Sequence, residues 1–399
     1  MSNKVVLAFS GGLDTSYCVK YLSREKSLEV HACLVNTGGF DDKQLLEVES
    51  RAKHLGVKTF TALDVQDEFY KKCVRFLIFG NVLKNNTYPL SVSAERVFQA
   101  LAIANYAKKM EADYVAHGST GAGNDQVRFD LIFQTICPEV EILTPIRDQK
   151  LSREQEIEFL KTHGVEIDWE KAKYSINQGL WGTSVGGAET LTSNQYLNEK
   201  AFPSQLNKDT PSEVEITFQK GEAVALNGES MKSVALIKAL NRIASEYAIG
   251  RDIHVGDTII GIKGRVGFEA AAPLILIKSH HALEKHVLTK WQLQLKEQPA
   301  SWYGNLVHEG QFLEPALRDI EQFLLSGQRN VSGKVMVQLN PYRFHIIGIE
   351  SPHDLMSSKF GSYGEMNKGW SGDDVKGFSK IFGNQGQIYY QVNKDEFGS

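Results

Sequence analysis

Hydrophobic and polar positions alternate in blocks along the first part of the chain, and these blocks predict strands and helices in turn. Val5–Phe9 is a continuous apolar run, which is typical of a strand buried on both faces of a parallel sheet. Glu29–Asn36 and Thr59–Leu63 predict further strands, and helical spacing predicts helices over Asp41–Leu55 and Glu68–Phe79. The alternation predicts a parallel sheet covered by helices, with ligands bound at the carboxyl ends of the strands.

The same pattern continues after a short loop. Thr87–Val92 contains a proline and has no helical period, so we expect a loop there. Ser93 is then expected to cap a helix whose apolar residues recur three or four positions apart. Tyr114–His117 predicts another short strand of the sheet.

The pattern changes in kind after Trp169, where a segment without a clean period begins. Glu213–Phe218 alternates polar and apolar residues, as a half-buried strand does, and Met231–Tyr247 has one apolar helical face. Further strands are expected at Thr258–Ile262, Leu274–Ile277, Gly333–Leu339 and Phe344–Ile349. We therefore predict a nucleotide-binding domain over residues 1–170 and an α+β domain with antiparallel pairing over residues 171–370.

The last segment, residues 371–399, begins with a predicted amphipathic helix. Its apolar stripe consists of Val375, Phe378, Ile381 and Phe382. Such a stripe at the end of a chain is expected to dock against another subunit.

Composition and charge narrow the class of protein. The 399 residues are 42% hydrophobic and 23% charged, which is ordinary for a globular protein, and the formal net charge is −4. A chain without a basic field is not expected to bind nucleic acid or an anionic membrane. The four cysteines are scattered and the N-terminal apolar run is too short for a signal peptide or a membrane span, so we expect a cytoplasmic protein.

The turn after the first strand has the chemistry of a phosphate site. Ser10-Gly11-Gly12 breaks the apolar run, and a helix is expected from Asp14. The N–H groups of such a turn point at one spot, where the helix dipole adds partial positive charge. Hydroxyls at Thr15 and Ser16 add further donors. The lysine of a Walker loop is missing, so the pattern indicates a different kind of phosphate loop.

A second glycine-rich segment, Gly118–Asp125, follows the strand at Tyr114–His117. Arg128, shortly after it, has the guanidinium geometry that holds a carboxylate with two hydrogen bonds. A solvated loop with an arginine at its rim is the alternative on this segment alone. The histidines in His280–His286 do not share one helical face, so no metal site is expected there.

Ser10–Ser16 reads SGGLDTS and resembles the signature of the PP-loop ATP pyrophosphatases, which cleave ATP between its α and β phosphates. Beyond this loop, the chain resembles the argininosuccinate synthase family over nearly its whole length. The motifs that carry this resemblance are AFSGGLDTS at the first loop, His117–Phe129, Tyr174–Ser184, Ile249–Asp257 and His280–Thr289. The resemblance implies a Rossmann-like α/β domain of the adenine nucleotide alpha hydrolase type, followed by an α+β synthetase domain and a terminal oligomerisation helix. It also implies a homotetramer.

The resemblance further implies an activity and a set of site residues. The family joins citrulline and aspartate to argininosuccinate with release of AMP and pyrophosphate, through a citrullyl-AMP intermediate. ATP is then bound by Ala8, Phe9, Ser10, Gly11, Gly12, Leu13, Asp14, Thr15, Ser16, Val35 and Gly118. Citrulline is bound by Tyr88, Ser93, Asn124, Arg128, Ser175 and Ser184, and aspartate by Thr120, Asn124 and Asp125. Asp14 and Asp125 are the candidate catalytic residues, and Mg²⁺ accompanies ATP, although no residue is predicted as a metal ligand.

One departure from the family concerns the citrulline site. The family places a glutamate and a tyrosine where this chain has Gly256 and Phe268. A glutamate there would balance the α-ammonium of citrulline. We expect Asp257 or Glu269 to take over that role; the alternative is a substrate that is N-acylated and has no ammonium.

Rival interpretations share the first loop but need other features. A tRNA-modifying PP-loop ligase would need a basic surface, and an amidotransferase would need a nucleophilic cysteine in a glutaminase domain. A nucleotide-binding subunit without catalytic activity would not need the second glycine-rich segment. None of these interpretations fits the sequence as well as that of a ligase that joins two small molecules.

Overall fold

The computed structural model describes residues 3–165, 174–357, 363–365 and 369–394. These residues fall into two compact units, Met1–Ser351 and Pro352–Ser399. The predicted boundary between residues 170 and 171 lies outside the described residues, and the division of the chain into three domains stays a prediction.

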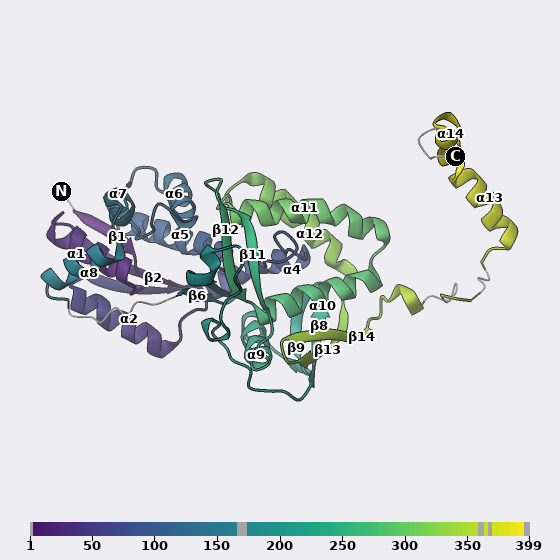
Figure 1. The fold of residues 1–399 in the computed structure, drawn as a ribbon, viewed down its shortest axis with the longest axis horizontal. Coiled ribbons are helices and arrows are strands. Elements are labelled where there is room, and N and C mark those ends of the chain that lie inside the picture. The colour runs from purple at the N-terminus through teal and green to yellow at the C-terminus, as the bar shows by residue number, and fades with distance from the viewer. Residues whose placement is uncertain (1–2, 166–173, 358–362, 366–368, 395–399) are drawn as a thin grey trace. The chain divides into compact units, whose positions relative to one another are not determined.

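The first sheet is parallel, as the alternating pattern predicts (Figure 1). Its strand order is β3-β2-β1-β4-β5. The strands are β1 (Lys4–Ala8), β2 (Glu29–Asn36), β3 (Thr59–Asp64), β4 (Tyr114–Ala116) and β5 (Glu141–Leu143). The direction of the strand order reverses between the neighbouring strands β1 and β4. In open α/β sheets, ligands bind at such a point, at the carboxyl ends of the strands.

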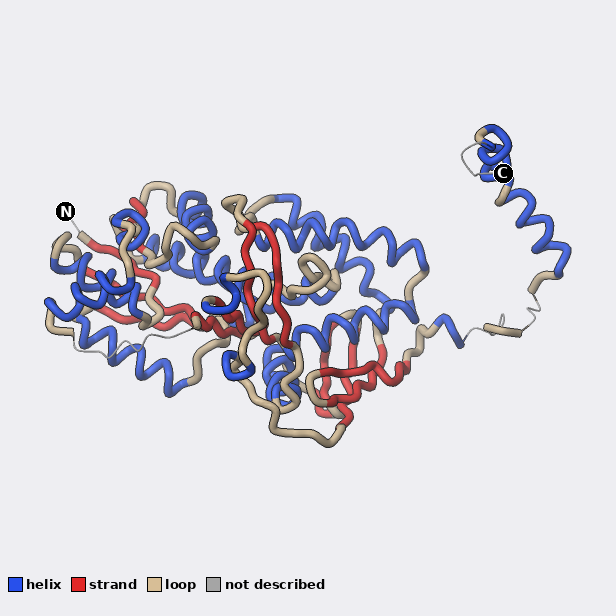
Figure 2. Tube along the Cα trace, viewed as in Figure 1, coloured by secondary structure: helices blue, strands red, loops and turns tan. Residues whose placement is uncertain are grey.

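Helices cover both faces of this sheet (Figure 2). They are α1 (Leu13–Arg24), α2 (Asp42–Leu55), α5 (Ser91–Lys109), α6 (Asp125–Ile136), α7 (Pro145–Gln149) and α8 (Arg153–Thr162). Val5 and Leu7 of β1 join the core formed by α1, α2 and α8, whereas Val6 joins the core that contains α5 and α6. The strand is therefore buried on both faces, which explains its continuous apolar run.

The segment after β3 is helical, but in three pieces. It consists of α3 (Gln66–Phe69), a π-helical turn (Tyr70–Val74) and α4 (Arg75–Phe79). This agrees with the helix predicted over Glu68–Phe79.

Two antiparallel sheets follow. One has the order β11-β12-β7-β6 and consists of β6 (Ser175–Gly179), β7 (Gly182–Gly186), β11 (Arg251–Asp257) and β12 (Lys263–Glu269). The other has the order β10-β9-β8-β13-β14 and consists of β8 (Ser212–Gln219), β9 (Glu222–Leu226), β10 (Glu229–Ser230), β13 (Gly333–Asn340) and β14 (Arg343–Glu350). The helices of this part are α9 (Ser233–Ser245), α10 (Ala271–Val287), α11 (Lys290–His308) and α12 (Pro315–Gly327).

Three sequence predictions were wrong. Leu274–Ile277 lies inside α10, most of whose residues are buried. A helix buried on most sides has a continuous apolar run, which sequence patterns do not distinguish from a buried strand. Thr258–Ile262 is the turn between β11 and β12, closed by a 2.8 Å hydrogen bond from the Thr258 N–H to the Ile262 carbonyl. Ser93 does not cap α5: the helix begins two residues earlier, after Leu90, and the Ser93 hydroxyl donates to the Leu90 carbonyl.

His280 belongs to a buried network within α10 and its neighbours. Its ring nitrogens hydrogen-bond Asn81 at 2.7 Å and Gln328 at 2.8 Å. Both nitrogens therefore have protein partners, which is typical of a structural histidine in a buried core.

The second unit contains α13 (Gly372–Phe382) and α14 (Asn384–Val392). Ser371 caps α13 by a reciprocal hydrogen-bond pair with Asp374. The apolar stripe of α13 is exposed within the described residues, since Phe378, Ile381 and Phe382 are each more than 60% accessible.

Candidate active site

The turn between β1 and α1 has the geometry of a phosphate loop. Gly11 adopts φ +78°, a left-handed conformation that favours glycine, and Gly12 is extended at the start of α1. In the described chain no side chain caps this helix, so its first N–H groups point toward the turn. The hydroxyls of Ser10 and Thr15 lie 3.4 Å apart at the turn, and Arg51, which also lines the cavity described below, donates to the Gly11 carbonyl. This arrangement suits a bound anion.

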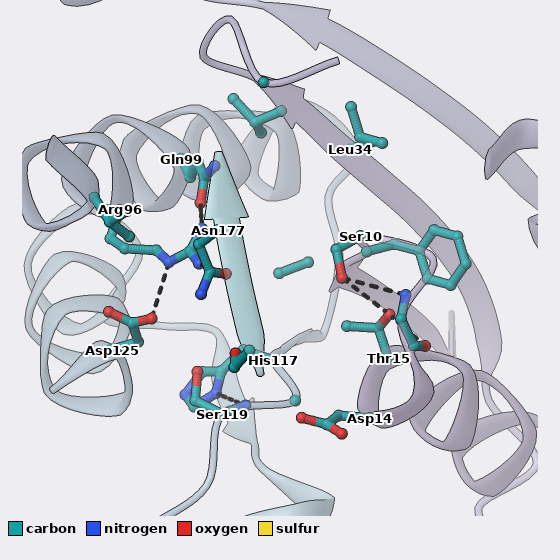
Figure 3. Close-up of a pocket in the computed structure, with 18 of the residues that line it drawn as sticks. Ser10, Asp14, Thr15, Leu34, Arg96, Gln99, His117, Ser119, Asp125 and Asn177 are labelled. Carbon is teal, nitrogen blue, oxygen red and sulfur yellow. Dashed lines mark hydrogen bonds and ion pairs between the residues drawn. The ribbon is translucent and has the colours of Figure 1, made fainter. Parts of the chain in front are cut away.

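A cavity of about 1090 Å³ opens above this turn, at the carboxyl ends of β1, β2 and β4. Figure 3 shows Ser10, Asp14 and Thr15 on one side of it and Arg96, Asp125 and Asn177 on the other. The volume is large enough for a nucleotide with a second small molecule. The predicted site residues that line it are Ala8, Phe9, Ser10, Gly12, Leu13, Asp14, Thr15, Val35, Gly118, Thr120, Asp125 and Ser175.

The other predicted site residues do not line this cavity. Gly11 and Ser16 lie behind the turn, where the Ser16 hydroxyl donates to the Gly12 carbonyl at 2.8 Å. The remaining ones belong to the predicted citrulline set: Tyr88, Ser93, Asn124, Arg128 and Ser184. The structure therefore gathers the predicted ATP residues more closely than the predicted citrulline residues.

The second glycine-rich segment is held against the first. A Cβ on Gly118 would lie 3.3 Å from Asp14, so only a glycine permits this approach of the two loops without displacement. The His117 ring accepts from the Ser119 N–H at 3.2 Å and hydrogen-bonds Asp130 at 3.0 Å. The start of the loop is thus anchored beside the cavity.

Asp14 forms a carboxyl pair with Glu156 of α8. Burial and the Asp14 charge raise the pKa of Glu156 to about 8, and burial raises the pKa of Asp14 as well. The pair therefore shares a proton at neutral pH. One oxygen of Glu156, Oε2, is buried without a hydrogen-bond partner among the described residues.

Asp125 stands at the opposite wall between two arginines. Its carboxylate accepts from Arg96 at 2.9 Å and from Arg128 at 2.8 Å, and Arg96 also donates to Asn177 at 2.7 Å. Burial opposes ionisation of Asp125, but the two arginines outweigh it and lower the pKa of this carboxyl. A carboxylate of such low basicity is better suited to positioning groups than to removing a proton.

Arg128 connects this wall to a second cluster of side chains. Its Nε and Nη2 donate to the His308 carbonyl at 2.9 and 2.7 Å. Tyr88 stacks on His254 with ring centroids 5.1 Å apart and contacts Phe268 at 5.4 Å. Its hydroxyl accepts from the Ser91 hydroxyl and the Val92 N–H, both at 3.2 Å.

Two more predicted citrulline residues, Ser184 and Asn124, contact β12 and the turn that precedes it. Ser184 on β7 pairs in register with Phe268 on β12, so it lies beside the ring that Tyr88 contacts. The Asn124 side-chain oxygen accepts from the Ile259 N–H at 2.9 Å, which ties the second glycine-rich segment to the β11–β12 turn. We call the set Tyr88, Arg128, Ser184, His254, Phe268 and His308 the β11 cluster.

Neither expected substitute for the missing glutamate lies free in this cluster. Asp257 follows Gly256 on β11, so its side chain points to the opposite face, where it pairs with Lys263 at 2.7 Å. Glu269 pairs with Arg251 at 3.0 Å and accepts from the Ser204 hydroxyl at 2.6 Å. Each of the two carboxylates thus has other partners, and the expectation that one of them replaces the glutamate stays a prediction.

Glu95 is a lining residue that sequence reasoning missed. It lies on α5, fully buried, and accepts from the Thr37 hydroxyl at 3.1 Å and the Trp181 N–H at 3.3 Å. Burial raises the pKa of Glu95 to about 8, so it is neutral at physiological pH. Arg96, Asn177 and Glu156 were missed as well. A charged pair inside an otherwise apolar helix was the available signal for Glu95 and Arg96.

Comparison with known proteins gives a consistent result over both parts of the chain. The family model described as "Arginosuccinate synthase N-terminal HUP domain" matches residues 4–166, and that described as "Arginosuccinate synthase C-terminal domain" matches residues 174–389. A protein named argininosuccinate synthase from Dictyoglomus turgidum is 39% identical over 97% of both chains. Proteins of the same name from Methanocaldococcus jannaschii and Xylella fastidiosa are 37% and 36% identical over 99% of this chain and 100% and 99% of their own.

Proposed function

The chain belongs to the argininosuccinate synthase family, whose function is the ATP-dependent ligation of citrulline and aspartate in arginine biosynthesis, and we propose how its cavity divides that reaction. The triphosphate lies on the Ser10–Ser16 turn with its α-phosphorus toward the far wall. The ureido substrate reaches that phosphorus from the β11 cluster, past Arg128. Aspartate occupies the space beside Thr120 and Asp125.

The observation that carries this assignment is the shared cavity. The phosphate turn and the Asp125 network face each other across one space, so an adenylated intermediate has both reactants within reach. The ureido oxygen attacks the α-phosphorus and pyrophosphate leaves, which gives citrullyl-AMP. The aspartate amine then attacks the ureido carbon and AMP leaves. Positioning of the reactants supplies most of the rate, because the reaction needs no protein nucleophile.

The chain's own donors stabilise the charge that develops. The uncapped N–H groups of α1 and the hydroxyls of Ser10 and Thr15 face the phosphates. Arg96 and Arg128 hold Asp125 as a fixed acceptor, which orients the aspartate ammonium before it loses its proton. Asp14 and Asp125 thus remain our candidates for residues that touch the reactants.

Mg²⁺ fits the carboxyl pair beside the phosphate turn. A cation between the two carboxyls would displace the proton that they share, and the two carboxylates would then offer the hard oxygen ligands that this ion prefers; one of them has a buried oxygen without a hydrogen-bond partner among the described residues. Asp14 and Glu156 would hold the ion, and the ion would supply charge neutralisation to the polyphosphate.

The exposed stripe of α13 supports assembly into a homotetramer, since such a face is costly in water. Light scattering of the full chain, and of a chain that ends at residue 370, tests this. All four cysteines are buried and unpaired, which supports the proposed cytoplasmic location. The described residues contain no helix long and apolar enough to cross a membrane.

Release of pyrophosphate tests the proposed activity. We expect sustained release from ATP only when both a ureido amino acid and aspartate are present, with AMP and the ligated product formed in equal amounts; without aspartate, release should stop at no more than one pyrophosphate per site. Omitting each reactant in turn separates this ligase from a tRNA-dependent one. Release that needs tRNA, or that never occurs with any ureido substrate, contradicts the proposal.

A further inference from the structure

Gly256 lies in a part of the site where basic side chains gather. His254 and Gly256 share one face of β11, because they are two residues apart on a strand. A Cβ on Gly256 would lie 2.6 Å from the His254 Nε2 and 3.3 Å from the Asn85 side-chain nitrogen. His254 therefore occupies the space that a side chain at position 256 would need.

Three further basic groups surround this position. The Lys84 ammonium donates to Asn305 at 3.1 Å, one helical turn before His308 on α11. Arg128 is bonded to the His308 carbonyl, and Asn85, next to Lys84, donates to the Val255 carbonyl at 3.2 Å. The loop at Lys84, α6, β11 and the end of α11 thus bring Lys84, Arg128, His254 and His308 together.

The charges of this group are not balanced by the nearby carboxylates. Arg96 and Arg128 share the single carboxylate of Asp125, which leaves one positive charge in that trio. Lys84 is hydrogen-bonded to a neutral amide. Asp257 pairs with Lys263, and both Asp257 and Glu309 act on Lys84 only as charges that form no ion pair with it among the described residues. Two positive charges therefore remain for ligands.

His254 provides an independent sign that a ligand binds here. Its side chain is only 6% exposed, and its Nδ1 is buried without a hydrogen-bond partner among the described residues. Burial and the charge of Lys84 lower the pKa of His254, and burial with the charges of Arg128 and Lys84 lowers the pKa of His308 to about 3. Burial is the main cause of both shifts, and the charges of Lys84 and Arg128 add to it. An ammonium group placed here would lose its hydration and face the same positive charges.

We propose that the ureido substrate preferred by this chain is acylated on its α-nitrogen by a dicarboxylic acid, and that Lys84 and His254 bind the free carboxylate of that acyl group. This inference rests on the proposed function, since it assumes that the β11 cluster holds the ureido substrate. One surplus positive charge, at Arg128, then meets the substrate's α-carboxylate, and the other, at Lys84, meets the acyl carboxylate. The acylated nitrogen is a neutral amide, so the site needs no carboxylate to balance it.

The direct test compares three ureido substrates with saturating ATP and aspartate: citrulline, N-acetylcitrulline and N-succinylcitrulline. We expect N-succinylcitrulline to have the highest kcat/KM of the three. It should exceed the value for citrulline by about 100-fold and the value for N-acetylcitrulline by about tenfold. Equal or better use of citrulline overturns the inference and leaves the ligase activity intact. Equal use of the two acylated substrates also overturns it, because the acyl carboxylate then has no role. If none of the three supports pyrophosphate release, the proposed function fails with it.

Substitutions at the two binding groups sharpen the test. Lys84→Gln should lower kcat/KM for N-succinylcitrulline by about tenfold, through KM, and leave N-acetylcitrulline nearly unchanged. His254→Gln also disturbs the ring stack with Tyr88, so it should lower kcat/KM for both acylated substrates, with a loss about tenfold larger for N-succinylcitrulline. Lys334→Gln is the matched control, because Lys334 is a half-exposed lysine paired with Glu215 on a different sheet. Equal losses with both acylated substrates would indicate a structural role and contradict the inference.

A double substitution tests the opposite preference. His254→Ala removes the ring that blocks position 256, and Gly256→Glu then adds a carboxylate. We expect the double variant to use citrulline better than the parent chain does and N-succinylcitrulline worse. Its folding is checked independently by thermal unfolding. A folded double variant that still prefers N-succinylcitrulline contradicts the inference.

Discussion

The phosphate turn and the β11 cluster recognise their ligands in different ways. The turn is one short segment, Ser10–Ser16, and offers backbone N–H groups and small hydroxyls to the cavity. The β11 cluster is assembled from the Lys84 loop, α6, β7, β11, β12 and α11, and its side chains contact rings or backbone groups of other elements. A local backbone site can serve any nucleotide-using member of a fold, whereas an assembled side-chain site determines which second substrate is accepted.

The largest effect is expected at the phosphate turn. Asp14→Asn should lower kcat by about 100-fold or more, since it removes the carboxylate that would hold Mg²⁺ beside the phosphates and breaks the pair with Glu156. Pyrophosphate release at saturating reactants measures this. Glu156→Gln, which leaves Asp14 in place, should cost about tenfold and raise the Mg²⁺ concentration needed. If the Asp14→Asn variant keeps more than a tenth of the activity, the assignment of Asp14 to the active site is contradicted.

The next largest effect concerns the β11 cluster. Arg128→Lys keeps the charge but cannot reproduce the two hydrogen bonds to the His308 carbonyl and the one to Asp125. The KM for the ureido substrate should rise by about 10- to 100-fold, and the KM for ATP should change by less than about twofold. Arg242→Lys, at an exposed position of α9, is the control. Equal changes in both KM values would mean that the two regions are not separate.

Glu95 lies between the two regions, and its predicted effect is on stability. The unfolded chain releases this proton above about pH 4.5, whereas the folded chain keeps it up to about pH 8. The folded state therefore loses stability as pH rises through this interval, by up to about 3 kcal/mol at pH 7. Glu95→Gln should remove that loss, so the variant should gain thermal stability at pH 8 and little at pH 4.5. Thermal unfolding without ligands measures this, and an equal change at both pH values would contradict it.

The smallest effect is expected in the β6–β7 hairpin, which carries Ser175 and Ser184. Gly182 has φ +116°, and a Cβ there would lie 2.8 Å from the Ala270 side chain. Gly182→Ala should therefore destabilise the fold by about 1–3 kcal/mol. Gly186, at the end of the same strand, has open space at its Cβ position, so Gly186→Ala should cost less than about 0.5 kcal/mol. Denaturant unfolding of the pair measures the difference, and equal stabilities would show that the hairpin accommodates a methyl group at Gly182.

By itself, the sequence determined the parts of this protein that depend on neighbouring residues. The run at Val5–Phe9, the glycines after it and the helix beyond form one continuous segment, so both the strand and the phosphate turn could be predicted. The antiparallel pairing of β13 with β14 could also be predicted, since their tight turn sets the register.

Only the tertiary structure decided the parts that depend on contacts between distant segments. Leu274–Ile277 is helical because α10 is packed on nearly all sides, and burial removes the period that distinguishes helix from strand. The gathering of Lys84, Arg128, His254 and His308 depends on contacts between the first part of the chain and segments more than 100 residues further on. The charge and basicity of such a group follow from burial and from these neighbours, and neither is determined by local sequence.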